Sequence, residues 1–224
     1  PGKTYYPAPR FYVEMVELMG ELLRHKYDVW VVSASNIWSV RWMILHALNP
    51  LLKARGIKQG LRPDHVVGIS TLLTDRAGRL YKDAVLVRDN PEYATLDTAT
   101  LGKFFVTRHP QFPVPTYSGK VACILDAIGV NPYLCVGDSP SDHPMMSFSR
   151  NRLWIARLYK PDFQRKTVVL TRQTGSQGWI IQPTLGAPAN SFLPALESSS
   201  EGIKRAVPEM CQSIQILRTL MRKS

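Results

Sequence analysis

The stretch L-C-V-G-D-S-P-S-D, residues 134–142, places an apolar run directly before a turn that holds two aspartates. A continuous apolar run of this kind is typical of a strand buried on both faces, as in a parallel sheet. Upstream, V-W-V-V-S-A-S (29–35) has the same form, a β-branched and aromatic run that ends in small and hydroxyl residues. Helical periodicity over 9–26 and 120–128 alternates with these strands. The alternation predicts an α/β fold, a Rossmann-like core whose parallel sheet is flanked by helices.

Residues 56–116 depart from this alternation. Val66–Ile69 and Leu80–Val87 are expected to be strands, and Thr74–Arg79 between them has the chemistry of a hairpin turn. The stretch from Asp89 to Tyr117 holds four prolines and is expected to be a loop. Together these features predict a β-hairpin and loop insertion into the core.

The C-terminal third continues the core and then leaves it. Further strands are expected at Leu153–Ala156, Val168–Leu170 and Trp179–Ile181. Residues 184–202, rich in Pro, Ser and Ala, are expected to be a loose connection, and Ile203–Met221 a closing helix. Near the start of the core, Asn36 or Ser35 is expected to cap the helix that follows the first strand. We therefore expect a core over 5–183, interrupted by 56–116, and an appended segment over 184–224.

Composition narrows the classes of partner. The formal net charge of +11 favours anionic partners, but the basic residues are scattered, so nucleic acid is an unlikely partner. No apolar run approaches the roughly 18 residues that span a bilayer, which indicates a soluble protein. The sequence is compatible with either the cytoplasm or the periplasm as its location. Three cysteines without C-x-x-C spacing predict neither a zinc site nor a disulfide framework. The oligomeric state is not readable from these features.

Three kinds of chemical group stand where predicted elements end or begin. Ser33 ends one strand, Lys120 opens a helix after Ser118-Gly119, and Asp138 and Asp142 flank the turn after another strand. A strand-end carboxylate suits Mg²⁺, which usually takes one or two carboxylates, while a lysine, a hydroxyl and backbone amides suit phosphate oxygens. Each signal alone also has a structural reading, as a helix cap or as turn chemistry. Their order along alternating strands and helices favours phosphoryl transfer.

V-V-S-A-S (31–35), S-G-K (118–120) and L-C-V-G-D-S-P-S-D (134–142) resemble the second, third and fourth motifs of the haloacid dehalogenase (HAD) superfamily of hydrolases. The closer resemblance is to the phosphoserine phosphatase group and the bacterial phosphorylcholine phosphatase-like group, over residues 5–185. It implies a Mg²⁺-dependent phosphatase that acts on a small phosphorylated metabolite through a phospho-aspartyl intermediate.

The resemblance also implies roles for individual residues. Ser33 and the Ala34 backbone would bind the phosphoryl group, and Lys120 would stabilise the phospho-aspartyl intermediate. Asp138 would ligate Mg²⁺, and Asp142 would support the metal or Lys120. Ser139 would either hold the turn or touch a metal-bound water. His143 beside this turn is expected to be a surface residue.

The family's first motif, D-x-D-x-[TV], does not occur in residues 1–224. It supplies the nucleophile, so we expect that motif, its strand and a helical cap upstream of Pro1, and this chain alone to be inactive. The alternative is a catalytically inactive HAD-like phosphate-binding or interaction domain.

Overall fold

The structure is a computed structural model that describes residues 11–175, 177–184 and 201–221. Its C-terminal half is built on three parallel strands in the order β6-β7-β8. Helices connect and flank them. The bounds are β6 (Leu134–Gly137), α8 (His143–Phe148), β7 (Asn151–Arg157), α9 (Pro161–Thr174), β8 (Trp179–Thr184) and α10 (Glu201–Met221).

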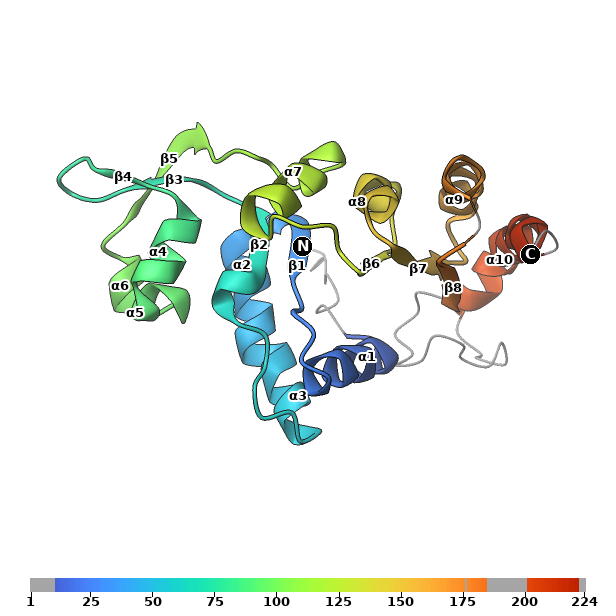
Figure 1. Cartoon of the computed structure of the whole chain (residues 1–224), viewed down its shortest axis with the longest axis horizontal. Coiled ribbons are helices and arrows are strands. Elements are labelled where there is room, and N and C mark those ends of the chain that lie inside the picture. Colours follow the sequence, from blue (N-terminus) through green and yellow to red (C-terminus); the bar gives the residue numbers. More distant parts are fainter. Residues whose placement is uncertain (1–10, 176, 185–200, 222–224) are drawn as a thin grey trace.

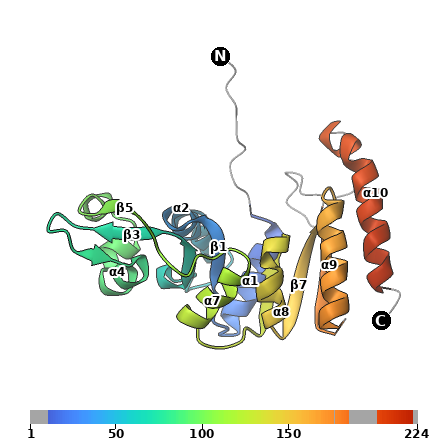
Figure 2. The same ribbon diagram turned by 90° about the horizontal axis from the view of Figure 1, so that it is seen from above.

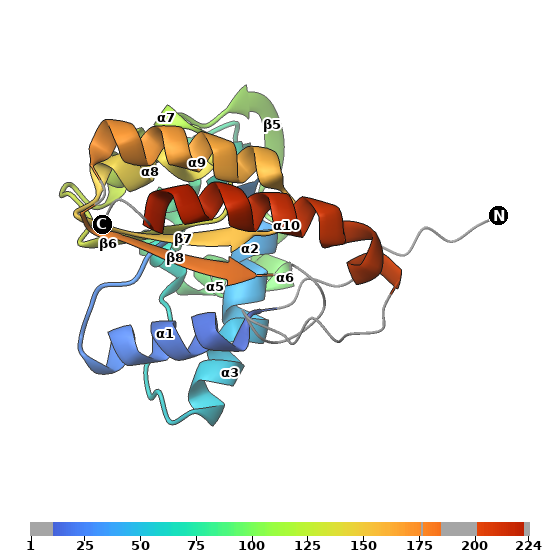
Figure 3. The same cartoon turned by 90° about the vertical axis from the view of Figure 1, so that its right-hand side faces the viewer.

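The two faces of this sheet are covered by different helices. Along β7, Trp154 and Ala156 contribute to a cluster with α8 and α10, whereas Leu153 and Ile155 pack against α1 (Val13–Arg24). Figure 3 shows α8 and α9 on one side of the strands and α1 on the other. This alternation explains why the apolar run is continuous, since both faces of the strand are buried.

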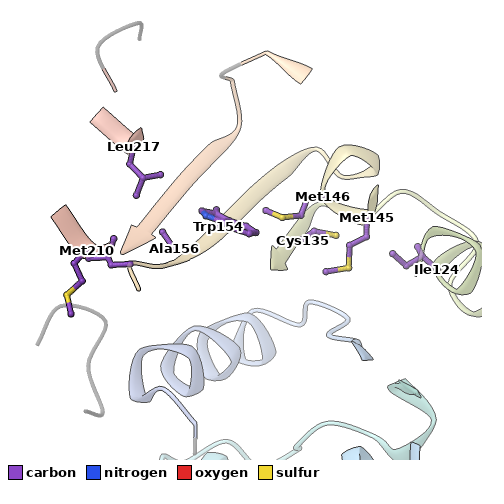
Figure 4. Close-up of a cluster of buried hydrophobic side chains, with 9 residues drawn as sticks. Ile124, Cys135, Met145, Met146, Trp154, Ala156, Met210 and Leu217 are labelled. Atoms are coloured by element: carbon purple, nitrogen blue, oxygen red, sulfur yellow. The ribbon is translucent and has the colours of Figure 1, made fainter. Parts of the chain in front are cut away.

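The first cluster centres on Trp154, whose side chain is fully buried (Figure 4). Met145 and Met146 come from α8, Cys135 from β6, and Ile124 from α7 (Ser118–Ala127). Met210 and Leu217 of α10 contribute from the far side, and Figure 2 shows α10 side by side with α9. The C-terminal helix is therefore packed onto the core.

A second parallel pair forms the other half. β1 (Val31–Asn36) pairs with β2 (Val66–Ile69), and α2 (Ile37–Met43), a π-helical turn (Ile44–Leu48) and α3 (Asn49–Ala54) connect them. Asn36 caps α2 by accepting hydrogen bonds from the amides of Trp38 and Ser39, so of the two expected caps, Asn36 and Ser35, it is Asn36 that serves. Val66–Ile69 is thus a core strand and not part of the insertion.

The insertion begins after β2. Its antiparallel sheet has the order β4-β3-β5, with short helices packed on one side (Figure 1). The elements are β3 (Thr71–Thr74), β4 (Leu80–Tyr81), α4 (Asp83–Asp89), α5 (Pro91–Ala94), α6 (Thr98–Leu101) and β5 (Phe105–Pro110). A buried ion pair between Arg41 of α2 and Asp83 of α4 ties the insertion to the core, and Tyr93 donates a hydrogen bond to Asp83.

Three predictions for these regions are wrong. Leu80–Val87 is a strand only at its first two residues and then helix α4, whose buried side chains recur at helical spacing. The expected loop from Asp89 to Tyr117 contains α5, α6 and β5. Val168–Leu170 lies inside α9, with Val168 buried and Val169 exposed. The expected connection over 184–202 falls largely outside the described residues.

The architecture confirms an α/β fold with parallel strands flanked by helices, compatible with a Rossmann-like core. Within the described residues, β1 pairs only with β2 and β6 only with β7, so each keeps one unpaired edge. β6 is the strand of its sheet that lies nearest β1 (Figure 1). No helix among the described residues is long and apolar enough to cross a membrane.

Candidate phosphoryl-transfer site

Lys120 lies in the first turn of α7, where the chain is tightly constrained. A Cβ on Gly119 would lie 1.9 Å from the carbonyl oxygen of Val114, so only glycine allows this close approach. Tyr117, just before the helix, has a positive φ of 47°. Glycine is therefore required in the middle of the S-G-K sequence, because it permits this close backbone contact one residue before Lys120.

The Lys120 side chain is buried and joins the two halves of the molecule. Its Nζ lies 2.8 Å from Asp142 Oδ1, and the exposed fractions of the two side chains are 6% and 8%. The same Nζ donates a hydrogen bond to the carbonyl of Val32 in β1, also at 2.8 Å. A lysine is rarely buried unless paired, so this position is specified by its two partners.

Asp142 is held by both of its carboxylate oxygens. While Oδ1 faces Lys120, Oδ2 accepts hydrogen bonds from the amides of Asp138 and Ser139, both at 3.0 Å, and from the Ser139 hydroxyl. The bond from the Ser139 amide is one half of a capping box over the 3₁₀ turn Pro140–Asp142, and in the other half the Ser139 side chain accepts from the Asp142 amide. Asp142 is thus suited to fixing Lys120 and the turn.

Gly137 and Ser139 shape the same turn. A Cβ on Gly137 would lie 2.6 Å from the Cβ of Asp142, so glycine is required where the strand meets the turn. The Ser139 hydroxyl hydrogen-bonds to Ser141 at 2.6 Å and to Asp142 at 3.2 Å. Of the two roles considered for Ser139, these contacts support holding the turn.

Asp138 is the more open carboxylate, with a side chain that is 49% exposed. Burial raises its pKa above the ordinary value, and the Arg157 guanidinium opposes that rise. Arg157 Nε lies 3.4 Å from Asp138 Oδ2. Sequence reasoning missed Arg157, although it follows the apolar run 153–156 as Asp138 follows the run that ends at Gly137.

Ser33 does not end its strand as predicted, because Ser33 and Ala34 are the third and fourth residues of β1, which continues to Asn36. They lie where the pairing of β1 with β2 becomes irregular after Val32. The Ser33 hydroxyl accepts a hydrogen bond from the Ser35 amide at 3.1 Å. Within the described residues the Ser33 hydroxyl hydrogen has no acceptor. Ser33 forms no hydrogen bond with Lys120 there, but it directly follows Val32, whose carbonyl Lys120 binds.

His143 is not the surface residue that was expected. Its ring is half-buried, lies against Trp154, and forms a hydrogen bond through Nε2 with the hydroxyl of Thr167 at 3.1 Å. Burial lowers its pKa. Position next to a polar turn misled the prediction, because the turn leads straight into the buried start of α8.

Of the two aspartates in the turn, only Asp138 has a carboxylate that is free to bind Mg²⁺. Asp138 is open to solvent on one side, whereas both oxygens of Asp142 are already bound by protein groups. Within the described part of the chain no group of three or more His, Cys, Asp or Glu side chains could hold a metal. Because Mg²⁺ often keeps several waters and only one or two carboxylates, Asp138 suits it as one ligand of a shared set.

No family model matches this chain, and no curated protein matches it either.

Proposed function

We propose that these residues are the HAD-like part of a phosphatase, which hydrolyses a small phosphomonoester with Mg²⁺ through a phospho-aspartyl intermediate. The observation that carries the proposal is the buried Lys120, held between Val32 of β1 and the acidic turn after β6. A fixed ammonium group between these two strands is suited to neutralise the charge of a phosphoryl group and of a carboxylate that attacks it. Ligands of parallel α/β sheets bind at this edge, outside the carboxyl ends of the strands.

The reaction requires a nucleophile that these residues do not contain. The D-x-D-x-[TV] strand of the family would supply it from outside residues 1–224. The edges of β1 and β6 that have no partner among the described residues support this proposal, since a parallel strand inserted there would join the two sheets. Its carboxyl end would then lie between the end of β1 and Asp138, next to Lys120.

In the proposed reaction an aspartate oxygen attacks phosphorus, and the bond from phosphorus to the leaving-group oxygen breaks as that oxygen takes a proton from an acid. Water then cleaves the acyl phosphate and releases inorganic phosphate, which restores the carboxylate. Ser33 would donate its free hydroxyl hydrogen to a phosphoryl oxygen, and Lys120 would neutralise the others. Asp142 would keep Lys120 in place, and Asp138 would hold Mg²⁺, which neutralises phosphoryl charge when bound.

The test is hydrolysis of a generic aryl phosphate by the full-length protein, with Mg²⁺ and with excess chelator. We expect Mg²⁺-dependent turnover that is lost in Asp138→Asn and retained in Asp126→Asn, which changes an exposed aspartate of α7. Turnover that survives Asp138→Asn would show that the site is wrongly assigned. Absence of turnover in the wild-type protein, together with retained binding of inorganic phosphate, would favour the catalytically inactive phosphate-binding domain.

A further inference from the structure

Arg157 is placed to act on the carboxylate to which the proposed function assigns the metal. It is the last residue of β7, which runs parallel to β6, so its side chain leaves the sheet at the same edge as Asp138. The guanidinium lies 5.2 Å from the centre of the Phe163 ring. Among the described residues Arg157 is the only cationic side chain within 4 Å of the Asp138 carboxylate.

The contact between Arg157 and Asp138 is a loose one. The separation of 3.4 Å exceeds the 2.7 to 3.2 Å that is usual for N–H···O bonds, and the buried Nε has no hydrogen-bond partner within the described residues. The buried pair of Arg41 with Asp83 is different, because two guanidinium nitrogens hold two carboxylate oxygens at 3.2 and 2.5 Å, although the Arg41 Nε likewise has no partner among the described residues. Arg157 has a single long contact where Arg41 has two hydrogen bonds, so the Arg157 contact is not optimised as a structural ion pair.

The carboxylate oxygens of Asp142 and Asp138 differ in the number of protein groups that bind them. Both oxygens of Asp142 are occupied by Lys120, two amides and a hydroxyl. Asp138 has Arg157 beside one oxygen and is otherwise half open to solvent. A divalent cation that binds Asp138 therefore meets the positive charge of Arg157 at the same carboxylate.

We propose that Arg157 is a built-in competitor for the divalent cation at Asp138. The guanidinium neutralises the carboxylate until a cation binds, and then withdraws along the Phe163 ring, where cation–π contact still stabilises it. Arg157 thereby lowers the affinity of the site for the metal and sets the cation concentration at which it fills. This inference depends on the proposed function, which makes Asp138 the metal ligand.

The size of the effect follows from the electrostatics of such pairs. A cation within about 4 to 6 Å of a carboxylate typically shifts its proton affinity by roughly 1 to 3 pKa units, and it opposes a bound metal cation in the same way. Since Asp138 is half exposed, we take the lower end of that range. Removal of the Arg157 charge should therefore strengthen divalent-cation binding by about tenfold.

The experiment is calorimetric titration of the full-length protein with Mn²⁺ as the probe. Arg157→Gln should bind Mn²⁺ about tenfold more tightly than wild type, while Arg157→Lys, which keeps the charge, should stay close to wild type. Arg165→Gln removes an exposed arginine of α9 that is paired with Asp162, and should leave the affinity unchanged. Circular dichroism of each variant confirms that it is folded.

Asp138→Asn separates failure of this inference from failure of the proposed function. If it abolishes Mn²⁺ binding while Arg157→Gln leaves the wild-type affinity unchanged or weaker, Arg157 is no competitor and only this inference is overturned. If the wild-type protein binds no Mn²⁺, or binds it equally well after Asp138→Asn, the metal assignment and the inference both fail. The inference would also be overturned if Arg157→Lys bound Mn²⁺ as tightly as Arg157→Gln and more tightly than wild type. In that case the positive charge would not be the cause of the weaker binding in the wild-type protein.

Discussion

Substitution of Lys120 by Met tests the structural centre of the proposed site. The substitution keeps most of the aliphatic length but removes the ammonium that faces Asp142 at 2.8 Å. At an effective dielectric constant of about 20, opposite charges at that separation attract by roughly 6 kcal/mol, before the cost of taking both from water is subtracted. Loss of one partner from a buried pair is therefore expected to destabilise the protein by about 3 to 5 kcal/mol.

The same change leaves the carbonyl of Val32 without its lysine donor, which adds to the cost. For a chain of this size each kcal/mol lowers the melting temperature by roughly 2 to 4 °C, so Lys120→Met should melt about 6 to 20 °C below wild type. Chemical unfolding followed by circular dichroism measures the free energy of unfolding, and calorimetry measures the melting temperature. The double substitution Lys120→Met with Asp142→Asn should recover part of the loss, because no uncompensated buried carboxylate remains.

The exposed Lys58 supplies the matched control. Lys58→Met should change the free energy of unfolding by no more than about 0.5 kcal/mol. A loss of less than about 1 kcal/mol in Lys120→Met, the value of an exposed ion pair, would refute the claim that a buried bridge joins β1 to the acidic turn.

Three further outcomes are expected. Arg41→Met should cost about 3 to 5 kcal/mol by leaving Asp83 buried without its charge partner, and should raise hydrogen exchange across the insertion relative to the rest of the chain; equal exchange everywhere would contradict this. Asp138→Asn should stabilise the protein at pH 7 without added metal, because the pKa of Asp138 is raised in the folded state, so the native carboxyl loses stability as pH rises from the unfolded pKa of about 4 to the raised folded one. The gain should vanish below about pH 4, and a loss of stability at pH 7 would be the contrary result. Burial raises the pKa of the Cys135 thiol to about 11, so peptide mapping after iodoacetamide treatment at pH 8 should find it unmodified while the exposed Cys211 is labelled; rapid labelling of Cys135 would mean that the core is open.

The strands that carry the site could be predicted because their burial is visible in their composition. The runs that became β6 and β7 are apolar throughout, as is typical of a strand covered on both faces. The apolar run Val168–Leu170, which lies in α9, shows that this pattern alone is not specific to strands. The pairing of Lys120 with Asp142 was likewise among the expected roles. In these segments local pattern and tertiary environment agree.

The errors arise where burial depends on distant polar contacts. α4 begins at Asp83 because that carboxylate is fixed by Arg41, 42 residues away, and by Tyr93, which no local pattern reveals. In α9 the buried face is largely polar, formed by Gln164, Thr167 and Thr171 beside Val168, so its helical period is hidden from a count of apolar residues. Arg157 was missed for a related reason, since its partner Asp138 lies in the turn after the neighbouring strand β6.

The most direct test of the central claim is to trap the phosphorylated residue. The full-length protein would be mixed with substrate and Mg²⁺, reduced with borohydride, which converts an acyl-phosphorylated aspartate to homoserine, and mapped by mass spectrometry. The account predicts one reduced aspartate, the first of a D-x-D-x-[TV] sequence outside residues 1–224, with less of it trapped in Lys120→Met. Turnover without any reduced aspartate, or reduction of an aspartate within these residues, would contradict the account.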